Sequence, residues 1–239
     1  MVHQAIHRKL YEHVEEAIGL RIIKGEYKPG DTLPNEEKLC AEFGVSRGVI
    51  REAFKVLQKK GLVLPRPKIG TQIQPKTQWN LFDADILVWK LGVGPQFEFL
   101  KKVTEVRSII ESEAARLSAA RASENEIEVI KTHFHRLETV LNDAEKFSYG
   151  KYLQVDMAFH LAILDASHNE LLSQICRTMR HAVQTARQAD IRDMKILLTS
   201  QPFHVAIVRA IEKKDPDRAY SASRALFEQL WENMPDHQA

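Results

Sequence analysis

Apolar residues in the first 75 positions follow helical spacing in three places. They recur every three or four positions over 5–24, and a shorter pattern of the same kind covers about 35–43. The third pattern spans 47–60, with an apolar stripe made of Val49, Ile50, Ala53, Phe54 and Leu57. Glycine and proline interrupt these patterns within 25–34 and at Gly44. The pattern predicts three short helices joined by tight turns.

A hairpin is predicted directly after the third helix. Ser46 suits the N-cap of that helix and Gly61 ends it. The following stretch, LVLPRPKIGTQIQP at 62–75, has β-branched residues on both sides of Gly70. Three helices and a hairpin within 1–75 predict a winged helix-turn-helix domain.

The rest of the chain has helical periodicity with one short connecting segment. Residues 76–95 suggest a linker helix that packs between domains, and we expect a helical domain over 96–239. Ser123 with Glu126 forms a capping-box pattern, and Pro216 directly after Asp215 is typical of a helix start. About six or seven helices are predicted, arranged as an all-α bundle.

Composition is that of a globular protein with 44% hydrophobic and 28% charged residues. No apolar run approaches the roughly 18 to 20 residues of a membrane span, and the N-terminus lacks the apolar segment of a secretory signal. We therefore expect a cytoplasmic protein without a membrane partner. Its two cysteines, Cys40 and Cys176, have neither zinc spacing nor a disulfide framework.

Charge is unevenly distributed. Residues 1–75 hold 13 Lys and Arg against 9 Asp and Glu, and within 44–70 the count is 7 against 1. Such a basic segment suits a polyanion, although a solvated basic face would explain the charge equally well. In a helix-turn-helix the N-terminal end of the last helix enters the major groove, and this end carries Arg47, Gly48 and Arg51.

The chemistry of these residues suits DNA. Arginine forks match guanine edges, and glycine permits a close backbone approach. The wing would contribute Arg66, Lys68 and Gly70. The lysines of the third helix, Lys55, Lys59 and Lys60, would meet phosphates together with the wing.

Several polar residues lie on apolar stripes of the predicted helical domain. Arg107 follows Val103 by one turn, and a buried charge needs a partner, which Glu111 could supply. Asp156 and His160 are four residues apart in an almost entirely apolar helix, and His204 shares a stripe with apolar residues. An Asp–His pair at this spacing can bind a divalent metal or form one buried hydrogen bond.

The stretch GEYKPGDTLPNEEKLCAEFGVSRGVIREAFKVLQKKGLV, residues 25–63, resembles the DNA-binding head of the GntR family. The resemblance covers nearly all of 5–73. It implies that Ser46, Arg47, Gly48, Arg51 and the wing around Lys68 contact DNA. Glu37 departs from the pattern, because some relatives have a base-contacting arginine there.

Three further segments resemble the FCD effector domain of FadR-type members of the family: EVRSIIESEAARLSA, DMAFHLAILDASHN and HVAIVRAIEKKDPDRA, within about 100–226. The resemblance implies that Asp156, His160 and His204 bind a metal, and that these residues and Arg107 line an effector site. The family's usual third histidine falls 22 residues after His204, where this chain has Leu226. The three remaining ligands can hold Zn²⁺ or Ni²⁺ if effector or water completes the shell, and we expect weaker metal binding than in the family. A cavity that holds no metal is the alternative.

The segment QWNLFDADILVWKL, residues 78–91, resembles the linker of the galactonate-responsive repressor group. A sugar acid, with a carboxylate and hydroxyls, would suit Arg107 beside a metal or two histidines. We expect a homodimeric repressor of a sugar-acid catabolic operon, such as one for an aldonate or hexuronate, on a pseudo-palindromic operator. Another small carboxylate, such as a hydroxy acid or dicarboxylate, is the alternative effector.

Two other classes of function are compatible with parts of the pattern. A metal-dependent hydrolase or isomerase could use Asp156, His160 and His204, but no nucleophile elbow, phosphate loop or paired general base accompanies them. Such an enzyme would also leave the DNA-binding head unexplained. In a DNA-binding protein whose helical domain only dimerises, Arg107 and His204 would form structural pairs.

Overall fold

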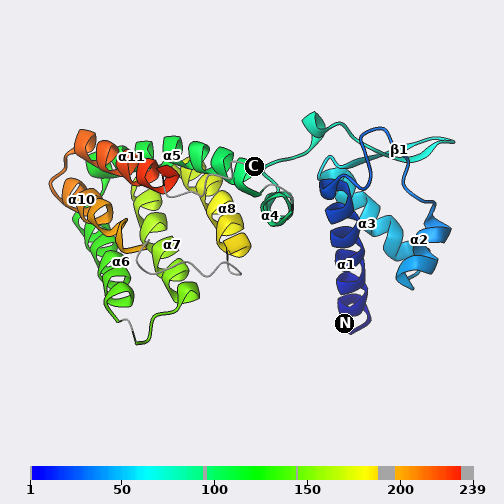
Figure 1. Cartoon of the computed structure of the whole chain (residues 1–239), viewed down its shortest axis with the longest axis horizontal. Coiled ribbons are helices and arrows are strands. Elements are labelled where there is room, and N and C mark those ends of the chain that lie inside the picture. The colour runs from blue at the N-terminus through cyan, green and yellow to red at the C-terminus, as the bar shows by residue number, and fades with distance from the viewer. Residues whose placement is uncertain (1, 94–95, 144, 188–196, 233–239) are drawn as a thin grey trace. The chain divides into compact units, whose positions relative to one another are not determined.

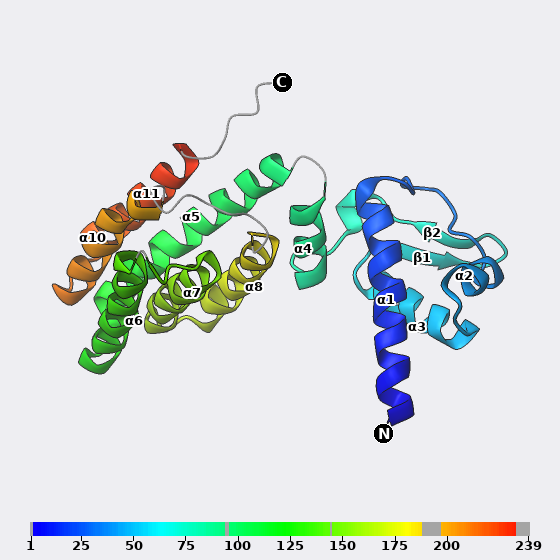
Figure 2. The ribbon, with the colours of Figure 1, turned by 60° about the horizontal axis from the view of Figure 1, so that its bottom comes forward.

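The computed structural model describes residues 2–93, 96–143, 145–187 and 197–232. The chain divides into two units, residues 1–96 and 97–239, and each is described here by itself (Figures 1 and 2).

The first unit contains the predicted winged helix-turn-helix. Its elements are α1 (Val2–Lys24), α2 (Glu36–Phe43), α3 (Arg47–Lys59), β1 (Val63–Arg66), β2 (Gly70–Ile73), the 3-10 turn η1 (Lys76–Gln78) and α4 (Ala84–Gly92). Helix α3 packs against α1 and α2, so its apolar stripe is buried as predicted. The strands pair antiparallel from Val63↔Ile73 to Arg66↔Gly70, and their connecting loop lies at an outer end of the unit (Figures 1 and 2).

Local signals in the sequence set the ends of α2 and α3. Asn35 caps α2 by accepting a hydrogen bond of 2.9 Å from the Lys38 N–H, and Gly44 ends it in the left-handed conformation (φ 64°). Ser46 occupies the N-cap of α3 with extended backbone, but its hydroxyl makes no capping bond within the described part of the chain. Gly61 has φ +74°, and an added Cβ would lie 2.1 Å from the Gln78 carbonyl oxygen. Only glycine fits there.

Helix α4, from the predicted linker, packs within the first unit. It contacts α1, and Ile86 and Trp89 belong to the same apolar core as Val14, Ile18 and Leu57. The Trp89 ring lies against Gly19, where an added Cβ would be 2.3 Å from a ring carbon. The core of this unit therefore extends beyond the hairpin to residue 89.

Lys60 also differs from the sequence-based expectation. We predicted that it meets phosphates, but it is only 6% exposed. Its Nζ lies 2.8 Å from Asp83 Oδ1, 2.5 Å from Asp85 Oδ2 and 3.3 Å from Glu15 Oε1. We call Glu15, Lys60, Asp83 and Asp85 the Lys60 cluster. Burial opposes the charge, yet the hydrogen bonds that Lys60 donates to Asp83 and Asp85 raise its pKa to about 12.

The second unit is the predicted all-α bundle. Its described helices are α5 (Gln96–Arg121), α6 (Glu124–Asn142), α7 (Tyr149–Ala166), α8 (Glu170–Arg187), α10 (Gln201–Glu212) and α11 (Pro216–Glu232). Helices α6, α7 and α8 lie side by side in Figure 1, and α10 packs against α11 and α6. The core includes Phe159, Ile130, Leu137 and Ile211. Within the described residues, none of the helices combines the length and apolar character that crossing a membrane requires.

Both predicted helix starts of this unit are present. Ser123 and Glu126 form the full capping box, with the Glu126 carboxylate accepting a hydrogen bond of 2.8 Å from the Ser123 N–H. Helix α11 begins at Pro216, and Asp215 Oδ1 accepts a hydrogen bond of 3.1 Å from the Arg218 N–H. These local bonds fix where α6 and α11 begin, and α11 lines the cavity described next.

Candidate functional site

A polar cavity lies among five helices of the second unit. It is lined by Arg107 from α5, by Tyr152, Asp156 and His160 from α7, by Arg180 from α8, by His204 from α10 and by Leu226 and Phe227 from α11, among others. The centre of a water molecule can occupy a volume of about 80 Å³ inside it. Since one water needs roughly 10–15 Å³ by this measure, the cavity has room for several water-sized groups.

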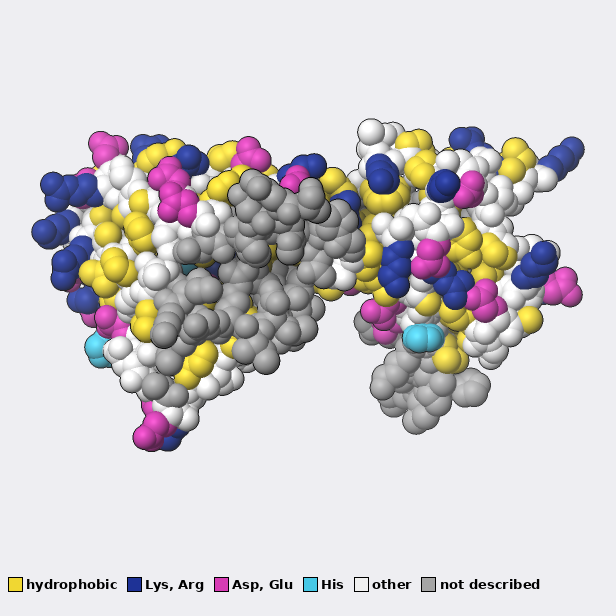
Figure 3. Space-filling model, viewed as in Figure 1, with side chains coloured by type: hydrophobic (Ala, Val, Ile, Leu, Met, Phe, Trp, Pro, Cys, Tyr) yellow, Lys and Arg dark blue, Asp and Glu magenta, His cyan; other side chains and the backbone are white. Residues whose placement is uncertain are grey.

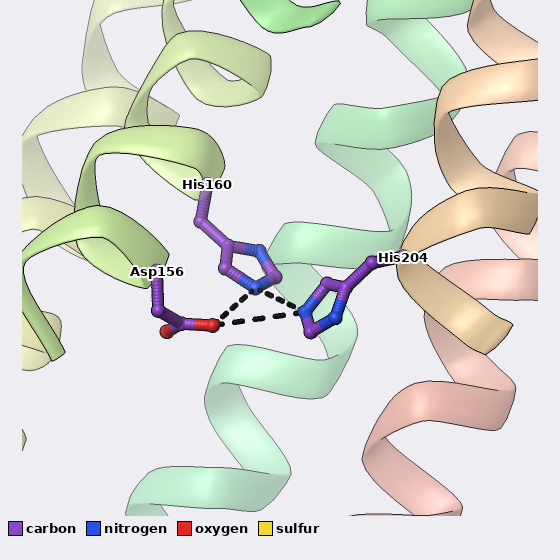
Figure 4. Close-up of side chains that lie close together, drawn as sticks. All are labelled: Asp156, His160 and His204. Carbon is purple, nitrogen blue, oxygen red and sulfur yellow. Dashed lines mark hydrogen bonds and ion pairs between the residues drawn. The ribbon is translucent and has the colours of Figure 1, made fainter. Parts of the chain in front are cut away.

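Three potential ligand atoms meet at this cavity. The Nε2 atoms of His160 and His204 are 3.4 Å apart, and each lies 3.6 Å from Asp156 Oδ1 (Figure 4). Asp156 and His160 are on one face of α7 because they are four residues apart, and His204 points toward them from α10 (Figure 4). Phe159 packs edge-on against both imidazoles, with ring centroids 5.1 and 5.4 Å away, and so restricts their orientation.

The protonation states of these groups are those that a metal requires. Burial lowers the pKa of His204 to about 3, and burial together with the charge of Arg180 lowers that of His160. Burial opposes ionisation of Asp156, but His160 and Arg180 outweigh it and hold the pKa of the carboxyl well below its usual range. Two neutral imidazoles and a carboxylate therefore face one another at neutral pH.

A buried carboxylate organises the surrounding charges. Glu111 Oε1 accepts a hydrogen bond of 2.8 Å from Arg107 Nε and one of 3.0 Å from Arg180 Nε. Glu111 Oε2 also bonds Arg180 Nη2 and lies 3.3 Å from His160 Nδ1. Arg107, Glu111, His160 and Arg180 are each at most 8% exposed, and we call them the Glu111 cluster. Burial opposes ionisation of Glu111, but the two arginines lower its pKa to about 2.

The Asp156–His160–His204 set fits a tetrahedral metal such as Zn²⁺. Two ligands about 2.0–2.2 Å from one zinc ion lie roughly 3.4 Å apart in that geometry. The three atoms are separated by 3.4, 3.6 and 3.6 Å. His160 Nδ1 lies 3.3 Å from Glu111 Oε2, and a proton on Nδ1 would leave the Nε2 lone pair facing the other two ligands, as metal-binding histidines require. His204 Nδ1 has no hydrogen-bond partner among the described residues.

The structure brings together the effector and metal residues that the sequence suggested. Arg107, Asp156, His160 and His204 all line the same cavity, and the expected Arg107–Glu111 ion pair is present. Leu226 lines the cavity as well and is 2% exposed. Arg180 was not named from the sequence, but the structure shows it to be buried, with 3% of it exposed. Its position between the buried residues Met179 and Val183 is the same signal that singled out Arg107, and it could have been found in this way.

The predicted DNA contacts lie at two exposed places in the first unit. Ser46, Arg47, Gly48 and Arg51 are exposed at the N-terminal end of α3, and Arg66, Lys68 and Gly70 are exposed in the wing. Arg51 Nε donates hydrogen bonds of 2.9 and 3.1 Å to the Glu36 carboxylate on α2, which lowers the pKa of Glu36. This contact orients Arg51 at the start of α3.

Comparisons with known proteins agree with this architecture. The family described as "Bacterial regulatory proteins, gntR family" matches residues 10–73, and the FCD domain matches 102–229. The HTH-type transcriptional regulator YieP of Escherichia coli K12 is 34% identical over 93% of this chain and 94% of its own length. The galactonate operon transcriptional repressor of the same strain is 31% identical over 88% of this chain and 90% of its own.

Among solved structures, Lar, which controls expression of the Listeria monocytogenes agr system, superposes with a TM-score of 0.57. It is 20% identical, covering 95% of this chain and 97% of its own, and supports the fold alone. A winged helix-turn-helix head and an all-helical domain with a buried polar cavity define a DNA-binding transcription regulator. The chain belongs to the GntR family and carries its FCD domain.

Proposed function

We propose that this protein is an effector-responsive repressor, in which a small carboxylate bound in the second unit weakens operator binding by the first. One observation carries the proposal. A potential metal-binding triad and two buried arginines line the same cavity. A core that only had to stabilise a dimer would gain as much from apolar residues, since buried ion pairs contribute little net stability.

A divalent metal, Zn²⁺ or Ni²⁺, would be held by Asp156, His160 and His204. When bound, it supplies a Lewis acid that fixes an anionic oxygen. Without it the cavity is close to neutral, because the charges of Arg107 and Arg180 are balanced by those of Glu111 and Asp156. A divalent cation would make the cavity net positive, which favours a carboxylate over a neutral ligand.

The effector would be a carboxylate that also carries hydroxyls. Arg107 and Arg180 are the cations that suit its carboxylate. The relative that represses the galactonate operon and the resemblance of residues 78–91 to that group support an aldonate such as galactonate, or a hexuronate. The cavity of about 80 Å³ is also large enough for a short hydroxy acid, so both sizes belong in the test.

The DNA contacts follow from the exposed residues of the first unit. Ser46, Arg47, Gly48 and Arg51 would approach bases in the major groove. Arg66, Lys68 and Gly70 would hold the DNA backbone. A homodimer would present two such heads to a pseudo-palindromic operator, and the effector would act by shifting the population of DNA-binding conformations.

Thermal unfolding of the purified protein tests this proposal. The panel contains aldonates, hexuronates, dicarboxylates and short hydroxy acids, each with Zn²⁺, with Ni²⁺ and with EDTA. A ligand at 100 times its dissociation constant adds about 2.7 kcal/mol to the free energy of unfolding. We expect one acid to stabilise the protein when metal is present. The same acid should release the protein from an operator selected in vitro. Absence of any stabilising acid would contradict the proposal.

Two variants separate metal from effector. Asp156→Asn should weaken metal binding, whereas Leu226→His adds an imidazole to the same cavity wall and should lower the zinc dissociation constant by at least about tenfold, or about 1.4 kcal/mol. If neither metal stabilises the wild type or Leu226→His, the metal is removed from the proposal. An acid that stabilises equally in EDTA would then remain as the effector.

A further inference from the structure

The wing ends in an exposed isoleucine. The strands pair as far as Arg66↔Gly70, so Pro67, Lys68 and Ile69 form the connecting loop. The Ile69 side chain is 58% exposed, although isoleucine is a residue that folding normally buries. A single exposed apolar residue is ordinary on a protein surface, so the setting of Ile69 has to carry any functional argument.

The backbone of the loop is sharply defined. The Ile69 N–H donates a hydrogen bond of 3.1 Å to the Arg66 carbonyl and closes a four-residue turn. Pro67 is at its second position, where proline is favoured, and Lys68 at its third has φ +64°. This left-handed conformation is uncommon for a lysine. Gly70 follows with φ +111°, and an added Cβ would lie 3.0 Å from Thr32 Cγ2.

Such a loop fixes the backbone of Ile69 at the tip in one conformation. Backbone strain of this kind is retained where the surrounding structure enforces it, and it often marks a recognition site. Here the enforcing contacts are the ladder hydrogen bonds of the hairpin and the isolated bridge between Thr32 and Gln72.

The charges around the tip favour nucleic acid. Arg66 and Lys68 flank Ile69 in the chain, and both are exposed. Figure 3 shows basic and hydrophobic side chains next to each other at the end of the hairpin. The cations would bring the tip to the phosphates of the DNA backbone. The minor groove is about 6 Å wide, so it admits a hairpin tip with one side chain but no helix.

We propose that Ile69 is a specificity-determining residue that enters the minor groove and selects A·T pairs at the base step it meets. Guanine carries a 2-amino group in the minor groove, which A·T pairs lack. The isoleucine side chain has no hydrogen-bond acceptor, so a G·C pair there would leave the amino group desolvated and unpaired. This proposal rests on the proposed function of the first unit as a DNA-binding head.

Selection from a random double-stranded DNA pool, followed by sequencing, needs no known operator. Wild type, Ile69→Ala and Ile69→Leu are compared with Phe82→Ala, a control because Phe82 is also 58% exposed and lies outside the hairpin. Wild type, Ile69→Leu and Phe82→Ala should all enrich A·T pairs beside the major-groove half-site. Ile69→Ala should enrich the same half-site with no preference at the flanking step.

Base analogues then test the minor groove directly. Replacing adenine by 2,6-diaminopurine adds the 2-amino group and leaves the major-groove edge unchanged. At the flanking step it should weaken wild-type binding roughly five- to tenfold and Ile69→Ala binding less than about twofold. The slope of log affinity against log salt should be the same for Ile69→Ala and wild type, whereas Lys68→Ala should reduce it by about 0.9.

Failure of this inference differs from failure of the proposed function. If wild type enriches a half-site and Ile69→Ala gives the same flanking preference, Ile69 does not determine specificity. Equal weakening of both proteins by diaminopurine would overturn it in the same way. If wild type enriches no sequence at all, the DNA-binding function of the head is contradicted.

Discussion

Glu111 is the residue on which the buried charges of the second unit converge. Replacing it with alanine leaves the buried Arg107 and Arg180 without their shared carboxylate. Breaking a buried ion pair from one side costs about 3–5 kcal/mol. We therefore expect Glu111→Ala to lower the free energy of unfolding by that amount, as measured by urea denaturation.

A matched control lies two residues further along the same helix. Glu113 pairs with Arg116 at 2.6 Å, but on the surface, where its side chain is 39% exposed. Exposed pairs contribute about 0–1 kcal/mol, so Glu113→Ala should be nearly neutral. Similar losses for both variants would show that the Glu111 cluster does not stabilise the domain through its charges.

The buried histidines predict a stability that depends on pH in the metal-free protein. His204 has a pKa of about 3 in the folded chain against an ordinary value of 6.5. Between these values only the unfolded chain binds the proton, so stability is full above pH 6.5 and falls as the pH falls. In EDTA, His204 should contribute a loss of up to about 1.4 kcal/mol per pH unit between pH 6 and 5. The lowered pKa of His160 acts in the same direction.

Urea denaturation at pH 7, 6 and 5 measures this slope. His204→Gln should flatten it. His135→Gln should not, because the His135 side chain is 83% exposed. A slope that is unchanged in His204→Gln would mean that another group binds the proton. Glu111 contributes below this window, because its pKa is lowered from 4.5 to about 2.

Among the elements, α4 depends on the Lys60 cluster for its attachment. Lys60→Met removes the cation that holds Asp83, Asp85 and the buried Glu15, so we expect a loss of about 3 kcal/mol or more. Lys59→Met changes the neighbouring, exposed residue and should stay within about 0.5 kcal/mol. Urea denaturation of the two variants compares them, and equal stabilities would show that the cluster is not needed to hold α4.

Elements and their ends were predictable because their signals are local. Periodicity located the helices, and Gly44, Ser123 with Glu126, and Pro216 marked helix boundaries. Lys60 was assigned to the DNA-binding face because its partners Asp83 and Asp85 lie 23 and 25 residues further along the chain. Arg180 carried a local signal of burial, but its pairing with Glu111, 69 residues away, could not be predicted from the sequence. Spacing alone does not reveal partners at such distances.

At the scale of the whole molecule, two separate cores predict two unfolding transitions. The apolar residues of the two core clusters belong to different units of the chain. Differential scanning calorimetry of the full chain should resolve two steps, and Zn²⁺ with a stabilising acid should raise only the step that belongs to residues 97–239. Operator DNA should raise the other step. A single transition that both ligands shift equally would show that the units unfold as one.

The packing of α4 has a consequence for building hybrid sensors from regulators of this family. A hybrid sensor joins the DNA-binding head of one relative to the effector domain of another. The end of the GntR match, at residue 73, would be the obvious place to join them. A fusion there would separate Lys60 from Asp83 and Asp85, and would take Trp89 away from Gly19. The transplanted module would expose the apolar surface that α4 covers, and its buried Lys60 would keep only Glu15 of its three carboxylate partners. A fusion point after α4 keeps these contacts within one parent, so hybrids should be joined beyond Gly92.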